Sequence, residues 1–127
     1  MPRPVLIDSS AWIEALRPDG EEDLRREVRA LIEDGAAVFC DLVLLELWNG
    51  ARGEAEQRYL ESLEEELETL PTTAEVWRRS RELARSCRTA GLTVPATDLL
   101  VASCAAHHGA SLLHRDRHFD RLREAVS

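Results

Sequence analysis

The sequence predicts an α/β fold in which a parallel sheet is covered by helices on both faces. Short apolar runs that favour buried strands alternate with longer segments in which apolar residues recur every three or four positions, as on one face of a helix. Strands separated by helices in this way pair in parallel. The length of 127 residues suits one domain with one core, so we expect a single domain over residues 1–127.

In the first half of the chain, caps and stops delimit two expected strands and four expected helices. Ser9 or Ser10 can cap the first helix and Asp41 the third, because their side-chain oxygens accept hydrogen bonds from free backbone N–H groups. Pro18-Asp19-Gly20 and Gly35 stand where helices stop. The expected elements are a strand at 5–7, a helix to about 16, a helix at 21–34, a strand at 36–40, and helices at 42–49 and 54–68.

The second half of the chain is expected to add two short strands and three helices. Leu70-Pro71 suggests an edge strand, since proline has no N–H to give to a sheet ladder. Thr72 or Thr73 starts a long helix that Gly91 ends, and Thr97 caps the helix that follows. The expected elements are an edge strand at 70–71, a helix to 90, a helix to 108, a strand at 111–114 and a helix at 119–124.

Composition narrows the possible function classes. The net charge of −8 argues against a surface built for tight, nonspecific DNA binding. Every basic side chain is an arginine, so the chain lacks the lysine with which a P-loop contacts phosphates. No apolar run is long enough to cross a membrane and no secretory signal is found, so we expect a soluble, cytoplasmic protein without a membrane partner. The three widely spaced cysteines are expected to be buried, reduced thiols.

Four carboxylates stand at positions where an α/β domain gathers functional groups. Asp8 and Asp116 follow expected strands, and parallel sheets form their sites at the carboxyl ends of strands. Asp98 lies in the first turn of a helix. Glu46 lies within Leu42–Trp48, an otherwise apolar helix in which an ionised carboxylate is costly unless a cation or donors meet it. Each acid also has a simpler explanation, because aspartates commonly cap or begin helices and Glu46 can lie on an exposed stripe.

Together the four positions predict a metal site. Strands lie about 4.8 Å apart, so Asp8 and Asp116 on adjacent strands would lie within a few ångströms of each other. Like charges that close cannot all stay ionised without compensation. A divalent cation compensates them, and hard carboxylate oxygens suit Mg²⁺ or Mn²⁺. We therefore expect Asp8, Glu46, Asp98 and Asp116 to form the catalytic and metal-binding site.

Four stretches around these acids carry a resemblance to a known family, namely Val5 to Ser10, Glu46-Leu47 with Gly50, Thr97 to Ala102, and Leu112 to Asp116 with Phe119. In these stretches the chain resembles the PIN-domain ribonucleases, and most closely the VapC toxins of toxin–antitoxin modules. The resemblance implies a three-layer α/β/α PIN-like domain that cleaves RNA endonucleolytically. It also implies a homodimer and a small VapB-type antitoxin that covers the site. The family's four acids carry over onto Asp8, Glu46, Asp98 and Asp116.

The resemblance also implies how the site would work, and two histidines depart from it. One or two ions would orient the scissile phosphate, activate a water and stabilise the leaving oxygen. Ser10 would hold Asp8 or a metal-bound water. His114 stands where the family often has Thr or Ser, and His118 where it often has Asp, so their contribution to the site stays open.

Two other functions stay open at this point. The first is a catalytically inactive PIN-fold module that binds an antitoxin or RNA. Four clustered acids argue against it, because a module without metal would gain nothing from their repulsion. The second is a metal phosphatase with a small substrate. Two Phe, one Tyr and three Trp leave few aromatic walls for such a pocket.

Overall fold

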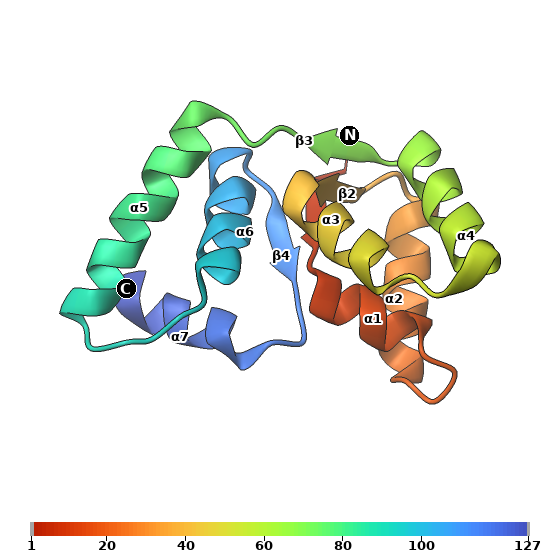
Figure 1. Cartoon of the computed structure of the whole chain (residues 1–127), viewed down its shortest axis with the longest axis horizontal. Helices are drawn as coiled ribbons and strands as arrows, with labels where there is room; N and C mark the ends of the chain where they lie inside the picture. Colours follow the sequence, from red (N-terminus) through yellow and green to blue (C-terminus); the bar gives the residue numbers. More distant parts are fainter. Residues whose placement is uncertain (1, 127) are drawn as a thin grey trace.

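The computed structural model describes residues 2–126 and has the expected alternation of strands and helices. Figure 1 shows the course of the chain. The strands are β1 (Val5–Ile7), β2 (Ala37–Cys40), β3 (Glu68–Leu70) and β4 (Ser111–Leu113). The helices are α1 (Ser9–Leu16), α2 (Glu22–Glu33), α3 (Asp41–Gly50), α4 (Gly53–Glu66), α5 (Ala74–Thr89), α6 (Ala96–His107) and α7 (Arg117–Val126).

The four strands form one parallel sheet, which confirms the predicted fold class. Their order is β3-β2-β1-β4, and β1 pairs in parallel with both β2 and β4. The chain therefore moves outward from β1 to β2 and β3, and then returns to the other side of β1 at β4. In open α/β sheets, ligands bind at the carboxyl ends of strands where the order reverses in this way. The topology places that reversal between β1 and β4.

Helices cover the sheet on both faces, as a three-layer α/β/α domain requires. In Figure 1, α5, α6 and α7 gather beside β4, whereas α1 to α4 gather around β1 and β2. The core between these layers is built from strand residues such as Leu6 and Ile7 and from helix residues such as Val43 and Val101, all essentially inaccessible to solvent. Trp12 of α1 stacks on Phe39 of β2 with ring centroids 5.4 Å apart. Burial of these aromatic rings fixes α1, and therefore its N-terminus, against the sheet.

Several element boundaries differ from the sequence-based expectation. Asp8 caps α1, so the expected caps Ser9 and Ser10 are the first two helical residues. Asp41 likewise lies inside α3, which follows Cys40 without a side-chain cap. The predicted cap at Thr97 is wrong because α6 begins at Ala96, directly after Pro95.

Other boundaries shift by a few residues. The edge strand ends at Leu70 rather than including Pro71, and the charged helix α4 ends at Glu66. The last helix begins at Arg117, two residues before the expected start, and β4 ends before His114. Thr73 does cap α5 by accepting a hydrogen bond from the Val76 N–H at 3.2 Å, as expected.

The three cysteines are free and buried, as expected. Within residues 2–126, no helix has both the length and the apolar character needed to cross a membrane.

Candidate functional site

Asp8 lies at the carboxyl end of β1, where the topology places a site. Its backbone N–H donates to the Leu113 carbonyl of β4 at 2.9 Å, so the residue continues the pairing of the two strands. Its side chain turns to the N-terminus of α1 and accepts hydrogen bonds from the Ser10 N–H at 3.0 Å and the Ser10 Oγ at 2.5 Å. Only 3% of Asp8 is exposed. Asp8 is therefore both a helix cap and a buried acid at the strand end.

The Ser10 hydroxyl joins the two segments that border this edge of the sheet. While it donates to Asp8, its oxygen accepts a hydrogen bond from the Arg115 N–H at 3.0 Å. Arg115 is fixed a second time, because its Nε donates to Glu21 at 2.9 Å. These bonds hold the β4–α7 connection against the start of α1. Ser10 holds Asp8 as the sequence suggested.

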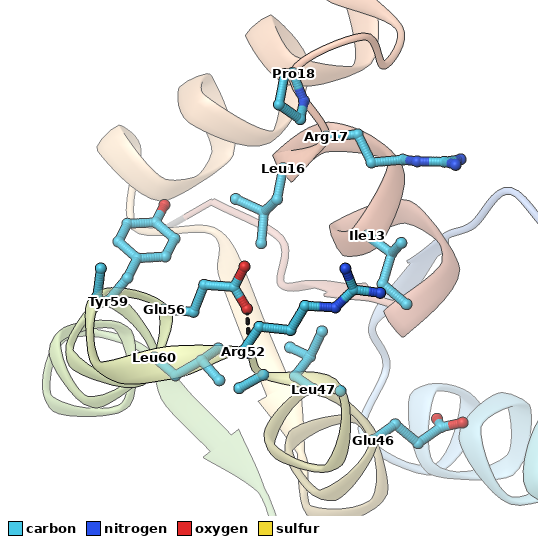
Figure 2. Close-up of a pocket in the computed structure, with 13 residues that line it drawn as sticks. Ile13, Leu16, Arg17, Pro18, Glu46, Leu47, Arg52, Glu56, Tyr59 and Leu60 are labelled. Carbon is cyan, nitrogen blue, oxygen red and sulfur yellow. Dashed lines mark hydrogen bonds between the residues drawn. The ribbon is translucent and has the colours of Figure 1, made fainter.

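Glu46 approaches the same region from α3. The Ser9 hydroxyl of α1 donates to Glu46 Oε1 at 3.1 Å, which connects α3 to the start of α1. Burial raises the pKa of Glu46; the Ser9 hydrogen bond opposes this effect, and the negative charges of Asp8 and Asp116 add to it. In Figure 2 the Glu46 side chain is drawn apart from the aromatic ring of Tyr59 and from Leu60. Glu46 therefore belongs electrostatically to the acidic edge.

Asp98 lies in the first turn of α6 and is 8% exposed. Burial raises its pKa to about 7, assisted by a hydrogen bond to Asp116 that only the protonated acid can make, and by the charges of Asp116 and Asp8. His118 acts in the opposite direction. Without a cation, Asp98 thus holds a proton at pH values where an ordinary aspartate is ionised.

Asp116 lies in the turn that leads from β4 into α7, and His118 lies in the first turn of α7. The backbone N–H of His118 donates to Asp116 Oδ1 at 2.9 Å, so Asp116 caps α7. Capping was the alternative role that the sequence allowed for this aspartate. Burial opposes ionisation of Asp116, but hydrogen bonds from the His118 backbone and from Asp98, with the nearby imidazole, outweigh burial and lower the Asp116 pKa. The site therefore divides its two closest acids into one that holds a proton and one that is ionised.

The three residues Asp98, Asp116 and His118 have ligand atoms that all lie within 4.8 Å of one another. His118 Nδ1 is 2.8 Å from Asp116 Oδ1 and 3.3 Å from Asp98 Oδ2. Within the described part of the chain, neither His118 Nδ1 nor Asp98 Oδ2 has a hydrogen bond of acceptable direction, although both atoms are buried. Buried polar atoms without partners are costly. Oxygen and imidazole ligands arranged in this way fit a divalent cation.

The sequence-based site and the structural cluster overlap in part. The structure brings Asp98 and Asp116 together and links Asp8 and Glu46 to them through charge, but Asp8 and Glu46 lie outside the close group of three ligands. Asp116 is also further from β1 in register than adjacent strands suggested: Ile7 pairs with Leu113, so Asp116 is two residues beyond the position beside Asp8.

Sequence reasoning gave too little weight to two neighbours of the acids. The inward direction of His118 depends on the turn that Asp116 caps, which no residue pattern specifies. Ser9 stabilises Glu46, and its position directly after Asp8 was the available signal. His114 contacts the site through the backbone of Asp116, because its Nδ1 accepts a hydrogen bond from the Asp116 N–H at 3.3 Å. Its ring lies 4.9 Å from the Phe119 ring, and its Nε2 lies 3.8 Å from Asp120.

A groove of about 860 Å³ lies beside this edge, between α1, α3 and α4 (Figure 2). Glu46 forms part of its wall, so the groove and the acidic edge share a border. Three large apolar side chains in the wall are exposed to solvent, namely Ile13 at 52%, Leu16 at 46% and Tyr59 at 43%. Arg17 and Arg52 add positive charge to the same wall.

The fold and the site together define an α/β protein with a parallel sheet and acidic side chains at the switch point, where open α/β sheets bind their ligands. Comparison with known proteins places the chain more narrowly. The PIN domain family matches residues 5–125. Ribonuclease VapC11 of Mycobacterium tuberculosis is 36% identical over 120 residues, which cover 91% of this chain and 89% of the relative. Ribonuclease VapC21 of the same species is 31% identical, with coverage of 92% and 84%. The chain belongs to the PIN-domain family, in its VapC branch.

Solved structures with the same fold include toxin–antitoxin complexes. A DNA-bound VapBC from Salmonella typhimurium superposes with a TM-score of 0.79 at 17% identity and covers 95% of this chain and 93% of its own. VapBC2 from Rickettsia felis, bound to a DNA fragment from its promoter, has a TM-score of 0.76 at 21% identity, with coverage of 92% and 91%. At these identities the likeness concerns the fold.

Proposed function

We propose that this protein is a metal-dependent endoribonuclease that acts as the toxin of a type II toxin–antitoxin pair. The observation that carries the proposal is the group Asp98, Asp116 and His118 at the switch point of the sheet, in which two buried ligand atoms lack hydrogen-bond partners. Its relatives of 31–36% identity are ribonucleases by name. The same observation disfavours an inactive binding module, because such a module has no use for a costly acidic cluster.

The carboxylates Asp8, Glu46, Asp98 and Asp116 would hold one or two divalent ions, Mg²⁺ or Mn²⁺. When bound, such an ion supplies positive charge for the scissile phosphate and lowers the pKa of water. The chain's own residues do the rest. Ser10 and Ser9 orient Asp8 and Glu46 through their hydroxyl groups.

Arginines near the acidic edge would bind the RNA backbone. Arg117 is exposed and directly follows Asp116, and Arg121 lies one turn further along α7. Arg52 extends along the wall of the groove that Glu46 borders (Figure 2). Cationic side chains on both sides of a negative site can position phosphates while the acids hold the ion.

The test of the proposed activity is RNA cleavage by an Asp8→Asn variant. Asparagine keeps the shape of Asp8 and its ability to accept from Ser10, but removes the charge needed to hold an ion. We expect cleavage of RNA by the purified wild type in Mg²⁺ or Mn²⁺, loss in EDTA, and no cleavage by the variant at unchanged secondary structure. Glu61→Gln on α4 is the matched control, because it removes one exposed carboxylate. Wild-type cleavage by the Asp8→Asn variant would refute the assignment.

The proposed partner is a VapB-type antitoxin whose apolar side chains occupy the groove between α1, α3 and α4. The support is the exposure of Ile13, Leu16 and Tyr59 in a wall that also contains Glu46, so an occupant of the groove would cover the acidic edge. Ile13→Asp is expected to leave cleavage intact but to weaken inhibition by the antitoxin encoded beside this chain. Full inhibition of that variant at equimolar antitoxin would place the partner elsewhere.

A homodimer is part of the same proposal. Leu45 on α3 and Trp77 on α5 are exposed by 64% and 51%, outside the wall of the groove. Exposed large apolar side chains are common at contacts between subunits. Light scattering of the free protein would decide between one copy and two.

A further inference from the structure

The Nδ1 atom of His118 is buried and faces the acids, although about a third of the side chain is exposed. This atom lies 2.8 Å from Asp116 Oδ1 and 3.3 Å from Asp98 Oδ2. The turn explains this direction: Asp116 Oδ1 accepts the His118 backbone N–H at 2.9 Å, which fixes the residue at the first turn of α7. The same carboxylate oxygen therefore positions the backbone of His118 and contacts its ring.

The distances from His118 Nδ1 to the two carboxylate oxygens match the spacing of neighbouring ligands around one ion. Neighbouring ligands in octahedral coordination at about 2.1 Å lie about 3.0 Å apart, since the separation is the bond length multiplied by the square root of two. The two distances from Nδ1, 2.8 and 3.3 Å, fall on either side of this value. A direct hydrogen bond would satisfy Nδ1 equally well, but the contact does not have the required direction.

Burial provides the second, independent observation. Asp98 is only 8% exposed, and its Oδ2 atom has no hydrogen-bond partner among residues 2–126. Nδ1 of His118 is buried and unpartnered in the same way. One nitrogen atom and one oxygen atom, 3.3 Å apart, are thus both buried without a hydrogen-bond partner among residues 2–126. A third group that accepts electron pairs from both would satisfy them together.

We propose that His118 Nδ1 is a ligand of the divalent ion, together with Asp98 and Asp116, and that it makes the site prefer Mn²⁺ to Mg²⁺. The inference rests on the proposed function for the ion itself. Imidazole suits transition metals, whereas Mg²⁺ prefers sites made of oxygen alone. A His at this position therefore changes the kind of ion that the acidic edge selects.

The opposite role for His118 is a counter-charge that takes the place of the ion. A cationic ring between Asp98 and Asp116 would compete with a metal, and its removal would tighten the binding of every divalent cation. The two roles therefore predict changes of opposite sign when the ring nitrogen is removed.

The experiment measures Mn²⁺ and Mg²⁺ binding by calorimetry in the absence of RNA, with pulsed EPR of bound Mn²⁺. The proteins are the wild type, His118→Phe, which keeps a ring without nitrogen, and His118→Asp, which makes the ligands all-carboxylate. His108→Phe is the matched control, because His108 follows the far end of α6 and contacts the Pro71 carbonyl. Circular dichroism verifies that each variant is folded.

We expect ¹⁴N coupling to Mn²⁺ in the wild type and in His108→Phe, and its loss in both His118 variants. Mn²⁺ affinity should fall roughly tenfold or more in His118→Phe, with a smaller change for Mg²⁺. In His118→Asp the preference for Mn²⁺ should disappear. Mn²⁺ bound without nitrogen coupling, tighter binding by His118→Phe, or no Mn²⁺ binding by the wild type would overturn the inference.

The metal experiment separates this inference from the proposed function. Nitrogen coupling in a protein that cleaves no RNA would leave His118 as a ligand and refute the ribonuclease. RNA cleavage by a protein whose bound Mn²⁺ shows no nitrogen coupling would support the ribonuclease and refute His118 as a ligand.

Discussion

Replacement of Asp98 by Asn should stabilise the ion-free protein at neutral and higher pH while it abolishes RNA cleavage. Asp98 is buried next to Asp116 and within reach of the Asp8 charge, and these neighbours raise its pKa to about 7. Above that pH the folded protein contains a buried carboxylate that it does not solvate. The amide introduced by the substitution has no charge and can donate a hydrogen bond to Asp116.

The magnitude follows from the pKa. The ordinary value is 3.8 and the folded value is about 7, a difference of roughly three units, and each unit corresponds to about 1.4 kcal/mol. The full amount overstates the gain, because solvent screens the partly open edge and Asp116 shares the proton. We retain about 1–2 kcal/mol, which corresponds to a rise in Tm of about 4–8 °C in a domain of this size.

The sign of the pH dependence is specific. A carboxyl group whose folded pKa is raised contributes stability that is complete below its unfolded pKa, near 4, and is lost as the pH rises through about 7. The wild type should therefore lose stability over that range relative to Asp98→Asn. The assay is thermal unfolding of both proteins in EDTA at pH 5 and pH 8. We expect nearly equal Tm values at pH 5 and a higher Tm for the variant at pH 8.

Equal Tm values at pH 8, or a difference that persists unchanged at pH 5, would refute the reasoning about Asp98. Addition of Mn²⁺ provides an internal check. The ion should raise the Tm of the wild type and affect the variant much less, because the variant lacks one of the ligands.

Three further predictions concern the site and the fold. Millimolar Mn²⁺ should raise the Tm of the wild type and EDTA should lower it, since an ion that binds only the folded state stabilises by mass action; an unchanged calorimetric titration would contradict a clustered site. Asp116→Ala should reduce cleavage less than Asp8→Asn or Asp98→Ala does, and should shift the dependence of cleavage on Mg²⁺ and Mn²⁺. Unchanged cleavage rates with a stability lower by about 0.5–2 kcal/mol would show instead that Asp116 is a helix cap alone. Gly20→Ala should lower the free energy of unfolding by about 1–3 kcal/mol, because the added Cβ would lie 1.9 Å from the Glu14 carbonyl oxygen. Gly50→Ala is the control, since open space surrounds that position, and its free energy of unfolding in urea should change little.

The alternation of strands and helices could be predicted because it follows from local patterns. Val5–Ile7 and Ala37–Cys40 are apolar and short, and their burial in the sheet needs no other information. The residues that cap the helices were harder to predict, since neighbouring residues compete for the N-cap position. Asp8, Ser9 and Ser10 can all accept hydrogen bonds from N–H groups at the start of α1. Which of them is the cap depends on the residue at which β1 ends. At α6, Pro95 precedes the helix because its fixed φ suits that position, which left Thr97 inside.

The candidate site likewise has features that the sequence predicts and features that it does not. Asp98 and Asp116 stand at element ends, where the topology of a parallel sheet brings side chains together, so their proximity could be anticipated. The separation of Asp8 from that close group could not, because it depends on the register of β1 with β4 and on the length of the turn after Leu113. The direction of the His118 ring depends on a side-chain rotation within that turn.

The pairing of β1 with β4 also determines when the edge can exist during protein synthesis. The hydrogen bond from Arg115 to Ser10 spans 105 residues of sequence, and Asp8 and Asp116 stand on the two sides of the same gap. A ribosome releases Asp8 more than a hundred residues before Asp116, so β1 and Asp8 emerge before the segment that they pair with in the folded protein. Contacts between such distant segments also form slowly, because a long loop must close first. The acidic edge of the sheet can therefore form only after the segment from β4 to the start of α7 has left the ribosome.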